Sequence, residues 1–272
     1  MIDVSFVAAC GSPCRRRNGP PAPVGCRLSV LAVPLRCGGG FLASPVARLE
    51  THQRQEFAMS QTVPLRNKIV QGDCIEIMGG IPAGSVDFIL TDPPYLVRYK
   101  DRTGRSLPND GNTDWLEPAA AQMFRVLKDN SLCVSFYGWT QTDRFMSAWR
   151  AAGFRIAGHI VFRKCYASKS RFVSYTHESA YLLAKGRPAL PDNPPADVID
   201  WVYSGNRLHP TQKPIAILKP LIEAFCPQGG LVLDPFCGSG STLVAARAVG
   251  RCYAGIELDS GYFHAASDRL AA

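Results

Sequence analysis

The sequence predicts an α/β fold built on a doubly wound, mostly parallel sheet. From residue 67 onward, short apolar runs of strand length alternate with segments of helical spacing, which is the pattern of βα units in a parallel sheet. Two of the runs, 86–90 and 231–233, are each followed by a turn that contains an aspartate and proline. In open α/β sheets, ligands bind at the carboxyl ends of the strands. Two such turns at one edge therefore predict two reactants held side by side.

The first half of this region begins with a strand over 68–71 that ends at Gly72-Asp73. The following helix, over 74–81, is closed by Gly79-Gly80 and Pro82. A polar segment over 96–112 has no period and is expected to form a mobile surface loop. The other elements predicted here are strands over 86–91, 132–137, 154–162 and 179–183 and helices over 115–127 and 140–152.

The second half opens with residues 188–208, which are rich in proline and are expected to be irregular. A helix is predicted over 214–225, with Pro214 in its first turn. Strands over 231–233 and 253–257 and helices over 241–249 and 261–270 complete the alternation.

Residues 1–58 differ from the rest of the chain. They are rich in arginine, carry runs of proline and glycine, and show no amphipathic pattern. We expect a disordered leader, read from an over-extended start with Met59 as the initiator, so that the folded domain spans 59–272. A targeting segment is one alternative. The other is a zinc site, but the cysteines of this stretch lack paired C-x₂-C spacing; they are Cys10, Cys14, Cys26 and Cys37.

Composition limits the class of protein. The chain has 272 residues, 30 basic against 22 acidic side chains and a net charge of +8, which favours a polyanionic partner such as nucleic acid. No apolar stretch is long enough to cross a membrane. The six cysteines after residue 58 stand singly, as is typical of reduced thiols in a cytosolic protein. We expect a cytoplasmic, nucleoid-associated protein.

The second turn predicts a cofactor site. A strand, an acidic glycine-rich turn, a helix and a strand ending at Glu257 form a mononucleotide-binding βαβ unit, in which Glu257 accepts hydrogen bonds from ribose hydroxyls. The turn lacks the lysine of a phosphate-binding loop and the third glycine of a dinucleotide site. Asp234 suits a ligand with an amino group, and S-adenosylmethionine has an ammonium, a sulfonium and a ribose. The turn reads Asp234, Pro235, Phe236, Cys237, Gly238, Ser239, Gly240, Ser241 and Thr242.

The first turn, Asp92, Pro93, Pro94 and Tyr95, predicts a site for an amine. The prolines stiffen the turn and lack N–H groups, so that an oxygen of Asp92 and the carbonyl of Pro93 can both accept from one –NH₂ group. Tyr95 offers a face on which a base stacks. Two acceptors would stabilise charge that develops on an exocyclic amine as it attacks a sulfonium methyl group.

These motifs resemble those of the amino-type DNA methyltransferases, which act on N6 of adenine or N4 of cytosine. The motif order, with Asp-Pro-Pro-Tyr before the glycine-rich turn, resembles their β class. The resemblance covers about residues 67–272 and rests on Gly72-Asp73, the two turns, His209–Pro214 and Glu257. It implies a Rossmann-like SAM-dependent methyltransferase sheet with an inserted target-recognition segment at about 187–208.

The resemblance also implies roles for individual residues. Asp73 is expected to face the cofactor's adenine, and the turn from Asp234 to hold its methionine part, helped by Thr211, Gln212 and Lys213. The loop over 96–112 is expected to order on double-stranded DNA, and the enzyme to be a homodimer. Aspartate at position 92 favours adenine N6 over cytosine N4; the cytosine enzyme, or a catalytically silent DNA-binding relative, is the alternative.

Chemistry on a paired base also requires that the base leave the stack. Candidate phosphate contacts are basic residues of the loop and of the segment that follows the strand at 154–162. They are Lys100, Arg102, Arg105, Arg163, Lys164, Lys169 and Arg171. No histidine shows the spacing of a metal site.

Overall fold

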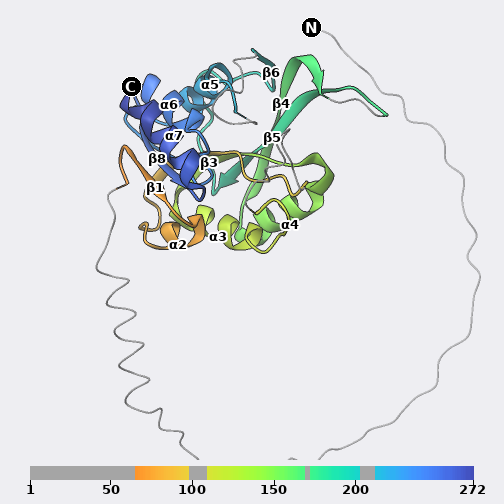
Figure 1. Ribbon diagram of the computed structural model, residues 1–272. Coiled ribbons are helices and arrows are strands. Elements are labelled where there is room, and N and C mark those ends of the chain that lie inside the picture. The colour runs from red at the N-terminus through yellow and green to blue at the C-terminus, as the bar shows by residue number, and fades with distance from the viewer. Residues whose placement is uncertain (1–64, 98–108, 169–171, 203–211) are drawn as a thin grey trace, which may run out of the picture. The chain divides into compact units, whose positions relative to one another are not determined.

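The computed structural model describes residues 65–97, 109–168, 172–202 and 212–272 of the chain (Figure 1). Its centre is an eight-stranded sheet of order β1-β8-β7-β2-β3-β5-β4-β6. The strands are β1 (Lys68–Gln71), β2 (Val86–Thr91), β3 (Leu127–Phe136), β4 (Arg155–Ser168), β5 (Tyr175–Lys185), β6 (Val198–Trp201), β7 (Leu231–Asp234) and β8 (Cys252–Glu257).

Six α-helices and one short 3₁₀ helix are described between these strands. They are α2 (Cys74–Gly79), α3 (Leu116–Val126), η1 (Trp139–Gln141), α4 (Thr142–Ala152), α5 (Ile215–Phe225), α6 (Ser241–Ala248) and α7 (Ser260–Ala271). The predicted leader, Thr211, His209 and the basic residues Lys100, Arg102, Arg105, Lys169 and Arg171 lie outside the described residues.

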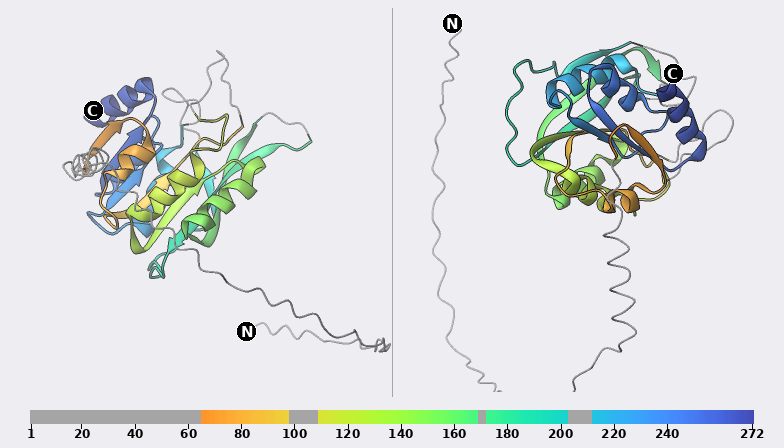
Figure 2. Two further views of the ribbon diagram at one scale, coloured as in Figure 1. Left: turned by 90° about the horizontal axis from the view of Figure 1, so that it is seen from below. Right: turned by 90° about the vertical axis from the view of Figure 1, so that its left-hand side faces the viewer.

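The predicted sheet, doubly wound and mostly parallel, is confirmed. β5 runs antiparallel to both of its neighbours, β3 and β4, and every other pairing is parallel. Helices α2, α3 and α4 cover one face, and α5, α6 and α7 cover the other (Figure 2). β2 shows why both faces are apolar: Ile89 packs with the first group of helices, whereas Phe88 and Leu90 pack with the second.

Three predicted elements need correction. The segment 188–208 is not wholly irregular, because β6 pairs with β4 at the edge of the sheet. Only Trp201 of its four residues is buried, and the strand is short and follows a proline-rich stretch, so the local sequence gives only a weak strand signal. β3 starts directly at the end of α3, earlier than predicted. The prediction missed this start because Lys128, Asp129 and Asn130 are exposed and give no apolar alternation.

The hairpin of β4 and β5 is the third correction. Its strands extend beyond the predicted 154–162 and 179–183 and project from the rest of the sheet (Figures 1 and 2). In the extension the two strands pair with each other, for example Arg163 with His177. Residues there are mostly exposed, so no apolar alternation is needed to hold them.

The strand order brings the two predicted turns together. β2 and β7 are parallel neighbours in which Ile89 pairs with Leu233, although the two strands lie far apart in the sequence. Each turn follows its strand directly, so both lie at the same edge of the sheet. No helix in the described part of the chain is long and apolar enough to cross a membrane.

Candidate active site

A single cavity at the carboxyl edge of β1, β2, β7 and β8 collects both turns. Its empty volume is about 1190 Å³, including its open mouth. The predicted residues that line it are Asp73, Asp92, Pro93, Pro94, Tyr95, Gln212, Lys213, Asp234, Pro235, Phe236, Gly238, Ser239, Ser241, Thr242 and Glu257. Residues of both predicted turns therefore face one cavity.

The glycine-rich turn is held by carboxylates at both of its ends. At its start, Oδ1 of Asp234 accepts a hydrogen bond from the N–H of Phe236 at 3.1 Å. Farther along, Oε2 of Glu257 accepts from the N–H of Gly238 at 2.7 Å, and Oε1 accepts from Asp259 at 2.9 Å. Gly238 has a φ of 51°, which a residue without Cβ adopts at little cost. Glu257 thus fixes the turn and still has lone pairs that face the cavity.

Gly240 has a structural role besides its predicted place in the cofactor turn. It is not among the residues that line the cavity. Its φ is 78°, and a Cβ placed there would lie 3.1 Å from Cβ of Ala266 in α7. The left-handed conformation and the close packing of α7 both favour a glycine at this position.

Asp73, which also lines the cavity, is the N-cap residue of α2. Its Oδ1 accepts from the N–H of Ile75 at 2.7 Å and, more weakly, from that of Glu76 at 3.4 Å. The N–H of Gly72 donates to the carbonyl of Glu257 at 2.9 Å. The cap and this bond fix the ends of β1 and β8 next to each other.

The polar groups of the cavity fit S-adenosylmethionine. Burial raises the pKa of Asp234 to about 7 and also raises the pKa of Glu257, so both carboxyls would be stabilised by a cationic or hydroxyl-bearing ligand. The side-chain oxygen of Gln212 is buried and has no hydrogen-bond partner within the part of the chain that the structure describes. A ligand donor would satisfy it.

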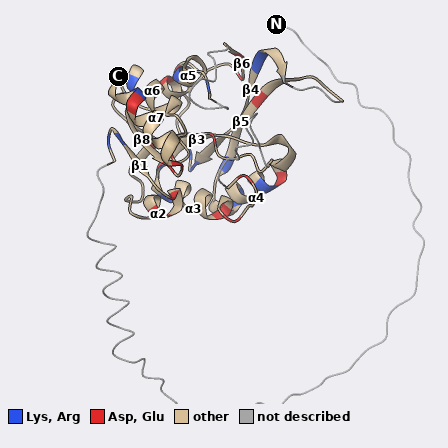
Figure 3. Cartoon of the chain, viewed as in Figure 1, with Lys and Arg blue, Asp and Glu red and all other residues tan. Residues whose placement is uncertain are grey.

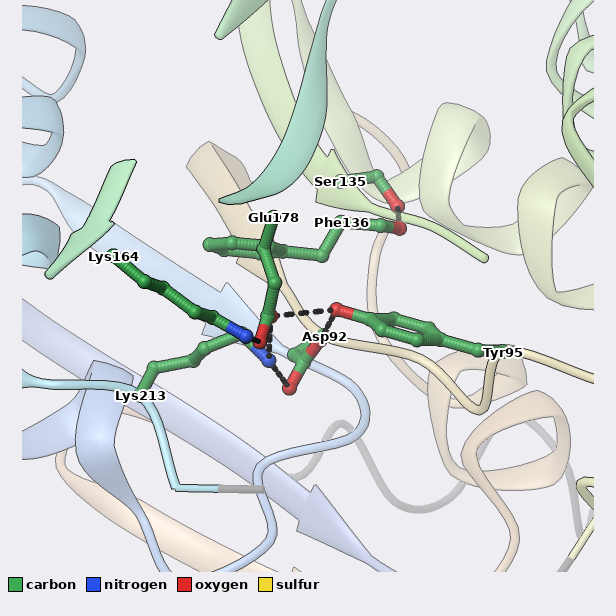
Figure 4. Close-up of polar contacts among 7 residues, drawn as sticks. All are labelled: Asp92, Tyr95, Ser135, Phe136, Lys164, Glu178 and Lys213. Carbon is green, nitrogen blue, oxygen red and sulfur yellow. Dashed lines mark hydrogen bonds and ion pairs between the residues drawn. The ribbon is translucent and has the colours of Figure 1, made fainter. Parts of the chain in front are cut away.

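Asp92 is already paired with two donors. The Tyr95 hydroxyl donates to Oδ1 of Asp92 at 2.7 Å, and Nζ of Lys213 lies 2.5 Å from Oδ2 (Figure 4). Nζ of Lys213 also lies 5.4 Å from the centre of the Tyr95 ring and 4.8 Å from that of Phe136. Lys213 directly precedes Pro214, the N-cap of α5. The start of this helix therefore holds a cation under the catalytic turn.

Two further charged residues complete this cluster, and neither was predicted to belong to it. Oε2 of Glu178, on β5, lies 3.2 Å from Nζ of Lys213, and its Oε1 lies 2.5 Å from Nζ of Lys164, on β4 (Figure 4). The Lys164 side chain is only 9% exposed, so its predicted role as a phosphate contact is wrong. Its ammonium is committed to Glu178 inside the protein.

A signal for both residues exists in the sequence. Glu178 is in phase with Ala180, and Lys164 with Phe162, at the period of two that places side chains on one face of a strand. Both apolar residues belong to the core under α5 and α6. Charged residues in phase with a buried face need partners, but which partners they meet depends on the order of the strands.

The electrostatics of the cluster follow from burial and alternating charge. Burial raises the pKa of Asp92, against the opposite effect of Lys213. Burial disfavours the charge on Lys213, but Asp92 and Glu178 outweigh it and raise its pKa. For Glu178 burial is likewise outweighed, so that Lys213 and Lys164 lower its pKa. Lys213 and Glu178 are therefore both charged at neutral pH.

The described ends of the segment 96–112 close on each other beside the cavity. The N–H of Val97 donates to Oδ1 of Asp110 at 3.2 Å. The indole N–H of Trp115 donates to the carbonyls of Asn109 and Asn112 at 2.9 and 3.1 Å. Asn109, Asp110 and Trp115 line the cavity and were not predicted. The centre of the predicted loop lies outside the described residues.

A surface charge on β4 is paired with one on the neighbouring edge strand, β6. Arg163, a predicted phosphate contact, lies 2.7 Å from Asp200 of β6, and both side chains are exposed. In the view of Figure 3, acidic and basic segments are interspersed over the described elements. Solvent and salt weaken an exposed pair of this kind, and Arg163 stays a candidate phosphate contact.

A nucleotide-type βαβ unit beside an Asp-Pro-Pro-Tyr turn defines an amino-group methyltransferase. Comparison with known proteins gives the family. The family model described as DNA methylase, for N6 and N4 enzymes, matches residues 86–268. The chain therefore belongs to the N6/N4 DNA methylase family; it is a DNA methyltransferase, and its methyl donor is S-adenosylmethionine.

Two relatives from Escherichia coli K12 are similar over most of the chain. The methylase YubD is 57% identical over 206 residues, which cover 76% of this chain and 91% of YubD. The DNA adenine methyltransferase YhdJ is 32% identical over 243 residues, with 74% of this chain and 82% of YhdJ covered.

Solved structures share the fold. The complex of M1.HpyAVI with S-adenosylmethionine is 25% identical, has a TM-score of 0.61, and covers 75% of this chain and 99% of its own. The cytosine-N4-specific PvuII DNA methyltransferase is 19% identical with a TM-score of 0.63, and the match covers 75% of this chain and 86% of PvuII. Because that identity is low, this second likeness concerns the fold alone.

Proposed function

We propose that this DNA methyltransferase modifies N6 of a flipped adenine in duplex DNA. The observation that carries the proposal is the Asp92 carboxylate, which closes the cavity beside the glycine-rich turn and is held there by Tyr95 and Lys213. The adenine specificity of YhdJ, at 32% identity, supports the choice of base. Residues 59–272 form the methyltransferase domain in this proposal.

On the cofactor side, four groups of the protein bind S-adenosylmethionine. Glu257 accepts from the ribose hydroxyls, and Asp73 faces the adenine of the cofactor. The turn from Asp234 to Thr242 holds the methionine part, with Asp234 opposite its ammonium. Gln212 also lines the cavity, and its buried oxygen accepts from whichever donor the ligand presents.

On the catalytic side, Asp92 and the carbonyl of Pro93 accept from the N6 amine while Tyr95 stacks on the base. S-adenosylmethionine supplies an electrophilic methyl group on its sulfonium. The lone pair of N6 forms the new N–C bond as the S–C bond breaks, which leaves S-adenosylhomocysteine, and one N6 proton then leaves through Asp92 or to water. Acceptors aimed at this nitrogen stabilise the positive charge that develops on it, and they stabilise the transition state more than the ground state.

The amine has to compete with the donors that Asp92 already holds. Each of its oxygens already accepts one donor, and a carboxylate oxygen can accept a second. The ring of Tyr95 is partly exposed to the cavity. Stacking on the base requires a small shift of this ring and weakens the bond of its hydroxyl to Asp92. The amine then takes the place of the hydroxyl.

Nucleoside analysis of methylated duplex DNA tests the proposal. DNA treated with the purified enzyme and tritiated S-adenosylmethionine is digested, and N6-methyladenine is expected as the labelled product. N4-methylcytosine alone would overturn the choice of base. Asp92→Ala is expected to bind the cofactor normally and to transfer no label; equal transfer by this variant would overturn the assignment of the site.

A further inference from the structure

The cluster around Asp92 contains a carboxylate that no step above uses. Glu178 lies half-buried beside the catalytic turn, with 23% of its side chain exposed, and is not among the residues that line the cavity. Its Oε2 lies 3.2 Å from Nζ of Lys213 and 3.4 Å from the hydroxyl of Tyr95. Both donors of Asp92 thus have Glu178 as a second acceptor.

We propose that Glu178, anchored by Lys164, is a positioning residue that receives Lys213 and the Tyr95 hydroxyl when the target amine engages Asp92. The inference rests on the proposed function, because it concerns the acceptor that Asp92 presents to the amine. A carboxylate saturated by an ammonium and a hydroxyl is a poor acceptor. A neighbouring carboxylate that takes over part of both bonds frees Asp92 without leaving a buried donor unpaired.

Distances favour a shift of this kind. Tyr95 lies closer to Asp92, at 2.7 Å, than to Glu178, at 3.4 Å, and Lys213 shows the same order at 2.5 and 3.2 Å. A displacement below 1 Å would therefore reverse both preferences. In Figure 4 the two donors lie between the two carboxylates. The bonds can pass from one acceptor to the other without breaking the cluster.

Lys164 keeps this arrangement neutral. The cluster alternates Asp92, Lys213, Glu178 and Lys164, so that two carboxylates meet two ammonium groups. Lys164 is 2.5 Å from Glu178 and also lies over the ring of Trp201 at 5.2 Å. Its position on β4 is fixed by the sheet. Glu178 is consequently held by a cation that does not move with the catalytic turn.

Polar and charged groups from several elements surround Asp92. Its own turn supplies Tyr95, the start of α5 supplies Lys213, β5 supplies Glu178, β4 supplies Lys164, and Asp234 stands at the end of β7. Asp92 and Asp234 affect each other through space, but Asp234 is common to every variant below. Differences between those variants therefore report on Glu178 and Lys164.

Opposite charge changes should shift the activity in opposite directions. Glu178→Gln removes a negative charge near Asp92, so the acid limb of the pH–rate profile should move to lower pH by about one unit. Lys164→Met removes a positive charge, so the limb should move to higher pH. In Lys164→Met/Glu178→Gln the two changes cancel, and the limb should return close to its wild-type position.

The rate separates positioning from charge. In the double variant the carboxylate is replaced by an amide, whose single neutral oxygen is a weaker acceptor for Lys213 and the Tyr95 hydroxyl. Methyl transfer should therefore stay about tenfold slower than in the wild type, which corresponds to roughly 1.4 kcal/mol. If Glu178 and Lys164 only supported the fold, the acid limb of the pH–rate profile would stay in place in both single variants. If Glu178→Gln alone does not fold, the Lys164→Met variant and the double variant still test the inference.

The experiment measures single-turnover methyl transfer from tritiated S-adenosylmethionine to duplex DNA between pH 5.5 and 9, with enzyme in excess. Lys128→Gln, which removes an ion pair with Asp87 outside the cavity, is the matched control and should leave the profile unchanged. Limbs that do not move, or that move in the same direction, overturn the inference. A wild type that methylates no adenine overturns the proposed function instead.

Discussion

Nζ of Lys213 lies 2.5 Å from Oδ2 of Asp92, although 121 residues separate them in the chain. Lys213 has only 5% of its side chain exposed, so this is a buried pair rather than a surface one. Its position follows from the start of α5, which points the side chain between the rings of Tyr95 and Phe136. The contact joins the catalytic turn to the segment before α5.

Lys213→Met should destabilise the protein and slow methyl transfer. Methionine can occupy the space between the two rings, but it leaves Asp92 and Glu178 without their shared cation. Loss of one partner from a buried pair costs about 3–5 kcal/mol, and the pKa of Asp92 rises because its strongest attractive charge is gone. Urea unfolding and single-turnover rates measure both effects.

The control for this variant is Lys128→Met. Lys128 pairs with Asp87 but is 45% exposed, so its loss should cost about 1 kcal/mol or less. Equal destabilisation by the two variants would show that the Lys213 pair is not a special feature of the site.

Binding of S-adenosylmethionine should weaken as the pH falls below 7. The pKa of Asp234 is raised to about 7 by burial, and an ammonium beside it favours the charged form. Below pH 7, binding must release this proton, so the Kd should rise by up to about tenfold per pH unit. Calorimetry between pH 5.5 and 7.5 measures the slope, and Asp234→Asn should bind weakly with no slope.

The same group should affect the stability of the free protein. The folded-state pKa of about 7 exceeds the ordinary value of 3.8, so the unfolded chain releases this proton first. The contribution of this carboxyl to the free energy of unfolding is therefore lost as the pH rises from about 4 to 7. Saturating S-adenosylmethionine should reduce that loss. Thermal unfolding across this range should show it, and Asp234→Asn should not.

Glu257→Gln should weaken cofactor binding without abolishing the fold. Glutamine has one acceptor oxygen, so it cannot hold Gly238 and Asp259 and also accept from a ribose. Hydrogen bonds to a charged group contribute about 1.5–3 kcal/mol, which corresponds to a roughly 10- to 100-fold rise in Kd. Calorimetric titration measures it. Glu117→Gln, at the exposed start of α3, should bind like the wild type.

Gly240→Ala should lower stability and leave cofactor affinity nearly unchanged. The left-handed backbone costs an alanine about 1–2 kcal/mol, and the new Cβ would meet Ala266 at 3.1 Å. Gly84→Ala is the matched control, since its φ is 62° and nothing lies within 4 Å of a Cβ there. The difference between the two in urea unfolding measures packing of α7. A large loss of affinity in Gly240→Ala would instead support the predicted role of this glycine in cofactor binding.

Motifs with local causes were predictable. The two turns follow apolar strands, and their prolines, glycines and acids determine local conformation whatever surrounds them. Asp92, Asp234 and Glu257 could therefore be placed at strand ends from the order of residues alone. Gly240 shows the limit of this approach, because the Ala266 side chain that restricts it comes from a helix that the local sequence does not place.

The sequence by itself determined the alternation of strands and helices, the two ligand-facing turns and the family. Only the tertiary structure decided that β4 and β5 bring Lys164 and Glu178 to Asp92 and Lys213. The physical reason is that a strand's period of two specifies which face a side chain occupies, but not which neighbour it meets there. That neighbour depends on strand order, which is set by packing across the whole sheet.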